Sequence, residues 1–350
     1  MRSRSYIAVP PGATIREQLK DRGMSQKEFA ARMDLSEKHV SKLINGDVQL
    51  TPEVAVRLET VIGIPAKFWN DLEAVYREKL IKAEMENAMD EDVELARLFP
   101  YNEMSGYGWI PKARNAKEKA INLRRYFGVV KLSLLSNQQI TRITCRKLDI
   151  TNKADLSLMA WAQEARIQAR DIKTPAINLQ GLGDLIPHIR QMTVMEPDII
   201  CPDIKKALSE LGVALVFLQH LKGSHPKGIT LADGNKIVVG LTAGEKDTDT
   251  FWFSLFHELA HIVLGHVWND GTTADHDENA ADAWSEDILI PPEEFAVFRS
   301  SADFSEKRVL DFAKAQGIAP GIVVGRMQRE RLIRYNSMLN RLKTKYEIAV

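Results

Sequence analysis

The chain has 350 residues, of which 45% are hydrophobic and 27% charged, and its 47 basic residues are balanced by 47 acidic ones. This composition is typical of a folded protein of two or three domains, and it excludes the disordered and fibrous classes. The zero formal charge excludes a protein that is basic as a whole, so a polyanionic partner would have to bind a local patch.

The expected compartment follows from cysteine usage and hydropathy. No apolar run approaches the length that spans a bilayer, and the first residues have no signal-peptide apolar region. Cys145 and Cys201 have no partner at chelating spacing, which argues against a disulfide framework or a thiolate metal site. We therefore expect a cytoplasmic protein without membrane contact, in which both cysteines are small buried hydrophobes.

Helical periodicity dominates the chain, and a short group of strand-like runs interrupts it. The expected fold class is therefore α+β, mainly helical with a small β-sheet. Breakers and changes of composition divide the chain into four regions: 1–82, 83–205, 206–300 and 301–350.

The first region is expected to form five short helices with tight connections. Within it, residues 25–47 have the layout of a helix-turn-helix. Ser25 is placed to cap one helix, with Glu28 three residues later as in a capping box. Ser36 follows a short turn and is placed to cap the next helix.

The second helix of this pair would bury Val40, Leu43 and Ile44 and turn its polar side chains outward. Insertion into the major groove of DNA needs such an outward polar face near the start of a helix. A small helical bundle with a solvated face would produce the same spacing, so the pattern alone leaves both interpretations open.

Further residues of this region strengthen the first interpretation: Pro11-Gly12, Ser25-Gln26, Ala30, Ser36, Ser41, Asn45-Gly46, Thr51 to Glu53 and Phe68-Trp69. With them, residues 10–78 resemble the Cro/C1-type (XRE) helix-turn-helix domain, specifically its HigA-like antitoxin branch. The resemblance implies binding of palindromic operators in double-stranded DNA as a homodimer, and a toxin is a further candidate partner. The DNA contacts that it implies are Gln26, which would touch phosphate, Ser36, Glu37, Lys38, Ser41, Lys42 and Asn45.

The second region has no catalytic motif. Its acidic segment 83–97 has few breakers and is expected to be helical. Further helices are expected around 115–127, 131–147, 154–171 and 181–192.

The third region begins with three runs rich in β-branched residues, around 213–219, 228–232 and 236–241. The last two are separated by Asp-Gly-Asn and are expected to form a hairpin, whose exposed edge could accept an extended peptide. A helix is expected to begin after Asp247 to Asp249, which would cap it and place negative charge at its start.

That helix carries the most informative motif, His257-Glu258-Leu259-Ala260-His261. Two histidines four residues apart on a helix point the same way and can bind one cation. Glu258 lies beside the cation, where it can take a proton from a water molecule, as in HExxH zinc hydrolases. Because the flanking residues are apolar, this helix should be buried, and a carboxylate between two histidines is costly there unless it is paired or near a metal.

A catalytic zinc site needs a third protein ligand and an open position. His266 follows His257 by nine residues, about half a turn out of phase, and the HExxHxxGxxH pattern fails at Leu264 and Val267. The third ligand is therefore expected on a second helix within 275–295 that folds back onto the first. From spacing alone, Glu278, Asp282, Asp275 and His276 all remain candidates.

The strand pair, the Phe-Trp lead-in to HExxH and the segment Glu278 to Ser285, which runs into Ile288-Leu289-Ile290-Pro291, resemble the ImmA/IrrE family of zinc metallopeptidases. Trp284, Ser285 and Ala260 depart mildly from the family pattern. The resemblance implies a zincin-like (gluzincin-like) endopeptidase core in 206–300, with Zn²⁺ on His257, His261 and Glu278 and with Glu258 as the base. It also implies a repressor or antitoxin-type protein as the substrate.

Other interpretations stay open. The ligands also suit Mn²⁺ or Fe²⁺. The chain could be a non-enzymatic HigA-like antitoxin or repressor with a structural or sensory metal site, or it could cleave its own helix-turn-helix.

His220 and His225 could line a substrate cleft, although such loop histidines usually have no catalytic role. Region 301–350 is expected to form two helices, and its basic segment 326–345 is best explained as a solvated amphipathic helix.

Overall fold

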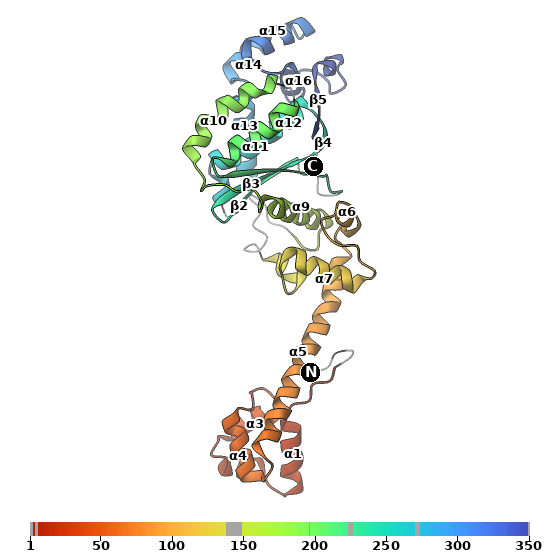
Figure 1. Ribbon diagram of the computed structural model, residues 1–350, viewed down its shortest axis with the longest axis vertical. Helices are drawn as coiled ribbons and strands as arrows, with labels where there is room; N and C mark the ends of the chain where they lie inside the picture. The colour runs from red at the N-terminus through yellow and green to blue at the C-terminus, as the bar shows by residue number, and fades with distance from the viewer. Residues whose placement is uncertain are drawn as a thin grey trace. The chain divides into compact units, whose positions relative to one another are not determined.

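The computed structural model describes residues 3, 6–137, 149–195, 197–222, 227–269 and 274–348, with the backbone alone at 197–199, 245, 246 and 274. Contacts divide the chain into two units, Met1–Val93 and Glu94–Val350 (Figure 1). The described residues are mainly helical with small sheets, which confirms the predicted α+β class.

The N-terminal unit contains the five predicted helices. Side-chain oxygens of Ser25, Ser36 and Thr51 accept hydrogen bonds from backbone N–H groups three residues later and fix the starts of the second, third and fourth helices. The fifth helix continues through the acidic segment, which is therefore helical as predicted. The helices are α1 (Gly12–Asp21), α2 (Gln26–Arg32), α3 (Glu37–Asn45), α4 (Pro52–Ile62) and α5 (Ala66–Ala96).

The core of this unit forms where α1, α2 and α3 meet. Phe29, Val40 and Trp69 are among its fully buried side chains. Gly12 begins α1 directly against α3, where a Cβ atom would lie only 2.0 Å from the carbonyl oxygen of Ile44. Only glycine fits this close approach of two backbones.

The C-terminal unit is built on a three-stranded sheet of the three predicted strands, β1 (Val213–Leu218), β2 (Gly228–Asp233) and β3 (Lys236–Thr242). The strand order is β1-β3-β2, with β1 parallel and β2 antiparallel to β3. The predicted hairpin joins β2 and β3, and Gly234 supplies its left-handed turn residue at φ 64°.

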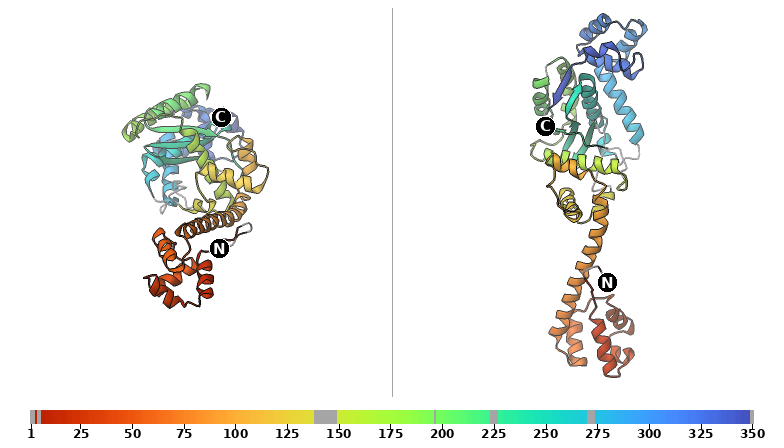
Figure 2. Two further views of the ribbon diagram at one scale, coloured as in Figure 1. Left: turned by 60° about the horizontal axis from the view of Figure 1, so that its bottom comes forward. Right: turned by 90° about the vertical axis from the view of Figure 1, so that its right-hand side faces the viewer.

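Helices cover both faces of this sheet (Figures 1 and 2). Side chains alternate along a strand, so neighbouring residues of β3 face opposite layers. At Gly240 the sheet meets Trp161 of α9 (Lys153–Ala169). On the other face, the ring of Phe217 is tilted by 40° against that of Phe251 of α12 (Thr248–Val263), with 6.4 Å between the ring centroids, and α11 (Pro197–Ser209) packs beside β1.

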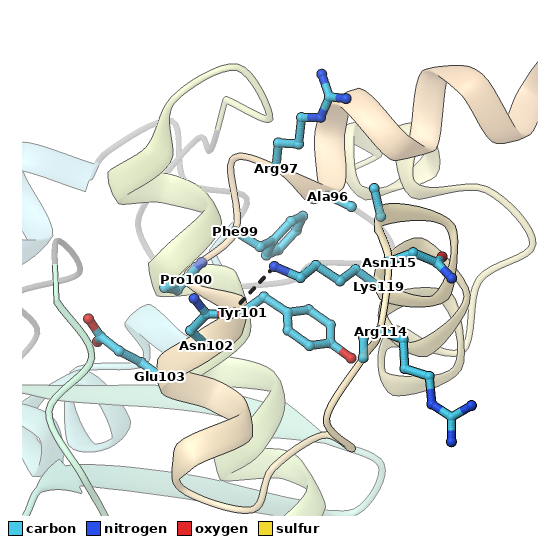
Figure 3. A pocket seen from close by; sticks show the side chains of 12 residues that line it. Ala96, Arg97, Phe99, Pro100, Tyr101, Asn102, Glu103, Arg114, Asn115 and Lys119 are labelled. Carbon is cyan, nitrogen blue, oxygen red and sulfur yellow. Dashed lines mark hydrogen bonds between the residues drawn. The ribbon is translucent and has the colours of Figure 1, made fainter.

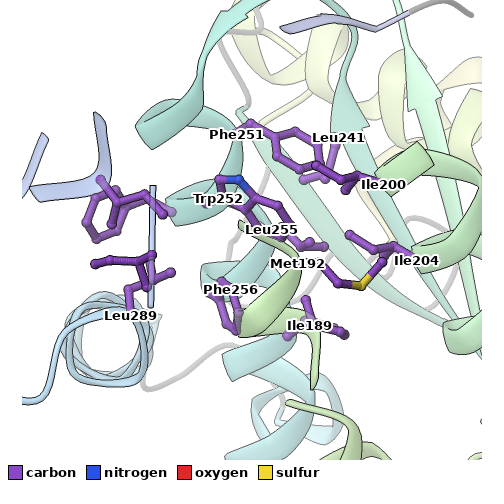
Figure 4. Close-up of a cluster of buried hydrophobic side chains, with 14 of the residues drawn as sticks. Ile189, Met192, Ile200, Ile204, Leu241, Phe251, Trp252, Leu255, Phe256 and Leu289 are labelled. Atoms are coloured by element: carbon purple, nitrogen blue, oxygen red, sulfur yellow. The ribbon is translucent and has the colours of Figure 1, made fainter. Parts of the chain in front are cut away.

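Helix α12 runs through the largest hydrophobic core. Its side chains Trp252, Leu255 and Phe256 are fully buried, and Figure 4 shows them among residues of the neighbouring helices and β3. The prediction that this apolar helix is buried is confirmed.

The helices expected around 115–127, 154–171 and 181–192 are present. Of the helix expected at 131–147, Leu132–Ser136 forms a 3₁₀ helix and 138–148 lies outside the described residues. Cys201 is half-buried against the core, and Cys145 lies outside the described residues. The remaining helices are α6 (Tyr101–Gly106), α7 (Ala116–Phe127), α10 (Leu179–Gln191), α13 (Ala274–Leu289), α14 (Pro292–Ser300), α15 (Glu306–Gln316) and α16 (Pro320–Arg329). The 3₁₀ segments are η1 (Leu132–Ser136), η2 (Met192–Val194), η3 (His266–Trp268) and η4 (Met338–Leu342).

The C-terminal region corrects one prediction. Segment 326–345 is not one amphipathic helix, because α16 ends at Arg329 and the chain continues through η4 to β5 (Lys345–Ile348). Strand β5 pairs with β4 (Gly244–Asp247), and its Tyr346 hydroxyl lies 3.2 Å from the indole nitrogen of Trp252. Burial of alternate residues of β5 against α12 favours the strand over a solvated helix.

The start of α12 also differs from the prediction. Asp247 occupies the capping position, but its side chain makes no capping hydrogen bond. Asp249 instead forms an ion pair with Lys343 at 2.8 Å, and the backbone N–H of Thr248 donates to the carbonyl oxygen of Thr344. The segment before β5 thus replaces the expected side-chain cap.

None of the described helices combines the length and the apolar character needed to cross a bilayer.

Candidate functional site

The first candidate site is the exposed face of α2 and α3 in the N-terminal unit. Asp34 adopts a left-handed conformation at φ 51° in the turn between the two helices, which an aspartate tolerates better than most residues. Val40, Leu43 and Ile44 are buried, as predicted. The predicted DNA contacts are all solvent-exposed: Gln26, Ser36, Glu37, Lys38, Ser41, Lys42 and Asn45.

Two of these side chains have partners within the protein. The Ser36 hydroxyl accepts the hydrogen bond that caps α3, and Arg16 donates to Oδ1 of Asn45 over 3.4 Å. Glu37, Lys38, Ser41 and Lys42 present a polar surface along the first two turns of α3, where a groove-binding helix carries its base contacts, and Gln26 lies at the start of α2. Their contacts with DNA remain predictions.

The second candidate site lies between α12 and α13. The Nε2 atoms of His257 and His261 are 3.2 Å apart, which follows from their spacing of one helical turn. Glu278, on the first turns of α13, places Oε2 3.2 Å from Nε2 of His257 and Oε1 3.5 Å from Nε2 of His261. Among the described residues these three side chains form a group whose ligand atoms all lie within 4.8 Å of one another.

Glu258 lies beside this group and is almost completely buried, at 6% exposure. The Thr230 hydroxyl of β2 lies 2.7 Å from its Oε2 atom, and Gly228 leaves room for it, since a Cβ there would lie 2.5 Å from Oε1. Burial raises the pKa of Glu258 to about 7, although the neighbouring His257 and the Thr230 hydrogen bond oppose the shift. Strand β2 therefore positions a carboxyl group that can exchange a proton near neutral pH.

His257 is oriented from its other ring nitrogen. Its Nδ1 atom lies 2.9 Å from Oδ1 of Asp282, which also accepts from Arg329 of α16 over 3.3 Å. Burial lowers the pKa of His257, but the hydrogen bonds to Asp282 and Glu278 outweigh it and raise the pKa to about 10. The hydrogen bond with His257 conversely lowers the pKa of both carboxyl groups.

His261 is held by a different set of side chains. Its Nδ1 atom lies 3.1 Å from Nδ1 of His266 in η3, and Nε2 of His266 faces Asp277. Burial and the positive charge of His257 lower the pKa of His261 to about 4, so His261 is neutral at physiological pH.

The donor set fits a divalent cation. Two imidazole nitrogens and one carboxylate converge from two helices, which is the ligand set of a His₂Glu zinc site. The carboxyl groups of Asp282 and Glu278 favour a positive charge at His257, since their hydrogen bonds raise its pKa. A cation at this position would supply that charge directly.

The other candidates for the third ligand lie elsewhere. Asp275 and His276 are exposed and do not join the group, and Asp282 bonds to the far side of His257. His266 contacts Nδ1 of His261, the ring nitrogen on the side away from His257. His220 is exposed in the loop after β1, where its backbone carbonyl accepts from Tyr107, and His225 lies outside the described residues.

Sequence reasoning missed four residues of this site: Gly228 and Thr230 of β2, Asp277 of α13 and Arg329 of α16. Their contacts depend on how separate elements pack, and no local motif marks them.

A cavity of about 630 Å³ lies apart from both sites, between the end of α5 and α7 (Figure 3). Lys119 extends across it over the ring of Tyr101, 5.1 Å from the ring centroid, and donates to Asn102 over 3.4 Å. The cavity shares no residue with the histidine site.

Comparison with known proteins concerns the N-terminal unit. A helix-turn-helix family model matches residues 15–69, which span α1 to the start of α5. An uncharacterised HTH-type transcriptional regulator of Escherichia coli (strain K12), YddM, is 38% identical over 63 residues. The aligned segment covers 18% of this chain and 67% of YddM.

Proposed function

Because the chain belongs, through its N-terminal domain, to the helix-turn-helix family of transcriptional regulators, we propose that α3 reads operator DNA and that the C-terminal unit is a zinc-dependent endopeptidase. The helix-turn-helix domain makes the chain a DNA-binding transcriptional regulator. Operator binding as a homodimer and a toxin partner are finer proposals, which rest on the resemblance to HigA-like antitoxins.

One observation carries the peptidase proposal: His257, His261 and Glu278 converge on one point, and a buried carboxyl group lies beside them. A zinc ion held there would polarise a peptide carbonyl and lower the pKa of a water molecule to about 7. Mn²⁺ or Fe²⁺ would suit the same ligands.

Glu258 is the proposed general base. Its pKa of about 7 lets it accept a proton from the attacking water at a carboxylate oxygen and pass it to the leaving amine. The Thr230 hydroxyl, 2.7 Å from Oε2, restricts the carboxyl group to one orientation. A base held in place in this way loses little entropy on reaching the transition state.

Strand β2 supports the binding of an extended peptide. Within the described residues it pairs only with β3, and so it forms an edge of the sheet. The same strand carries Gly228 and Thr230, which contact Glu258, so a peptide added along this edge would pass close to the base. By the family resemblance, we propose a repressor or antitoxin-type protein as the substrate.

The alternative is a non-enzymatic HigA-like antitoxin or repressor whose metal site is structural or sensory. Structural zinc sites are closed by four protein ligands. Among the described residues, the group contains three, and the side chain of Glu278 is 53% exposed, which favours a site that is open on one side. The peptidase is therefore the better supported proposal.

The test compares the zinc-loaded wild type with Glu258→Gln on lysate proteins, including any repressor encoded beside the gene. New N-termini are mapped by amine labelling, with and without a chelator. We expect fragments that need zinc and disappear with Glu258→Gln although this variant still binds zinc, whereas His257→Ala should lose both metal and cleavage. Normal cleavage by Glu258→Gln would exclude this residue as the base, and zinc binding without cleavage would favour the alternative.

A further inference from the structure

A row of buried polar side chains continues behind the candidate metal ligand His261. His266 lies 3.1 Å from it, Nδ1 to Nδ1, and the Nε2 atom of His266 faces Oδ1 of Asp277 at 3.7 Å. Asn269 donates to the other oxygen of Asp277 over 2.8 Å. His261, His266 and Asp277 are each at most 6% exposed, so protein groups must satisfy most of their hydrogen-bonding capacity.

The geometry determines where the ring protons lie. Two ring nitrogens 3.1 Å apart can bond only if one carries a proton and the other offers a lone pair. The Nε2 atom of His261 faces Nε2 of His257 and the Glu278 carboxylate, where a cation requires its lone pair. A neutral His261 therefore carries its proton on Nδ1 and donates it to His266.

We propose that His266 is a positioning residue for the metal site: its neutral ring accepts the Nδ1 proton of His261 and so fixes the tautomer that directs Nε2 at the ion. This inference rests on the metal site of the proposed function. His266 in turn carries its proton on Nε2, toward Asp277. It is not a ligand itself, because its contact is with the ring nitrogen of His261 that points away from Glu278 and His257.

The two ligand histidines are thus held by different chemistry. A half-exposed carboxylate, Asp282, accepts from His257, whereas a buried neutral imidazole accepts from His261. A neutral acceptor orients the ligand without adding a charge that would need neutralising in the hydrophobic core. His266 would therefore affect metal affinity through one hydrogen bond.

The mutational test measures Zn²⁺ affinity of the full chain by competition with a chromophoric chelator. His266→Phe keeps a ring of similar size but removes the acceptor, and we expect affinity to fall about 10- to 100-fold. His266→Asn places an oxygen near the position of Nδ1 and should stay close to wild type. His188→Phe, on the exposed side of α10, is the matched control and should have no effect.

Unchanged affinity in His266→Phe would overturn the inference. So would equal losses in the Phe and Asn variants, because packing rather than the acceptor would then matter. A wild type that binds no Zn²⁺ would overturn the metal site and this inference together, whereas tight binding that is insensitive to His266→Phe would overturn the inference alone.

A measurement on the wild type does not depend on whether the variants fold. Long-range ¹H–¹⁵N correlation of the histidine rings in the zinc-loaded protein reports which nitrogen carries each proton. We expect a protonated Nδ1 in His261, and in His266 a protonated Nε2 with an unprotonated Nδ1. A proton on Nδ1 of His266, with or without one on Nε2, would contradict the inference.

Discussion

His257 shows how neighbouring side chains decide the chemistry of one imidazole. Two carboxyl groups contact it, Asp282 at Nδ1 and Glu278 at Nε2, and in the metal-free protein they raise its pKa to about 10. His261, one turn away, has a pKa lowered to about 4 by burial and by the charge on His257. The two proposed ligands would thus enter metal binding in different protonation states.

The different pKa values of His257 and His261 predict that metal binding depends on pH. At roughly pH 7.5–9, His257 is protonated because its pKa is about 10, whereas His261 is neutral because its pKa is about 4. In this range zinc must therefore displace a proton from His257 but none from His261. Apparent affinity should therefore rise about tenfold per pH unit and level off above pH 10. Zinc titrations against a competing chelator across this range measure the slope.

Asp282→Asn is the matched variant for this prediction. It replaces the carboxylate whose hydrogen bond raises the pKa of His257, so the plateau should begin at a lower pH and the slope should be shallower. The variant should also bind zinc about 10- to 100-fold more weakly at high pH, because His257 loses its orienting carboxylate. A wild-type affinity that does not vary with pH would contradict the assignment of His257 as a ligand that binds in competition with a proton.

At the scale of single elements, α3 is the helix expected to bind DNA. Lys38 and Lys42 are exposed on it, and neither forms an ion pair with another described residue in the structure. If Lys42 contacts a phosphate, Lys42→Ala should weaken binding to any DNA sequence and reduce the slope of log affinity against log salt by about 0.9.

The charge-matched control is Lys79→Ala, on the exposed side of α5 and far from α3 in the sequence. Fluorescence anisotropy with operator-containing DNA at several salt concentrations measures both variants. Equal salt slopes for wild type and Lys42→Ala would remove Lys42 from the interface, and a reduced slope for Lys79→Ala would assign the basic contact to α5 instead.

The elements also show how much the sequence could predict. The hairpin and the pairing of His257 with His261 depend on local spacing and could be predicted directly from it. The helix-turn-helix also needed the family resemblance, because a small helical bundle has the same spacing. Choosing Glu278 as the third ligand required the family resemblance, because from spacing alone Asp282, Asp275 and His276 also remained candidates. Asp282 instead lies one turn further along α13 and reaches the opposite side of the His257 ring.

Long-range contacts account for the remaining errors. Strand β5 has only four residues and begins at the last residue of the basic segment 326–345, so its alternation was too short to oppose a helical prediction. Its position depends on Tyr346 packing against Trp252, which lies 94 residues earlier in the chain. Arg329 likewise reaches Asp282 only because α16 packs along α12.

At the scale of the whole molecule, the chain combines a DNA-binding unit with a second unit that holds the proposed metal site. The three proposed ligands belong to the C-terminal unit, and the residues expected to contact DNA belong to the N-terminal unit. Zinc content should therefore depend on residues of the C-terminal unit and not on the DNA-binding residues of the N-terminal unit.

The most direct measurement is the zinc content of the full chain after saturation with zinc and removal of the excess, by inductively coupled plasma mass spectrometry. We predict one zinc per chain for the wild type, for Glu258→Gln and for Lys42→Ala, and far less for His257→Ala, His261→Ala and Glu278→Ala. A wild type without zinc, or ligand variants that retain one equivalent, would contradict the account.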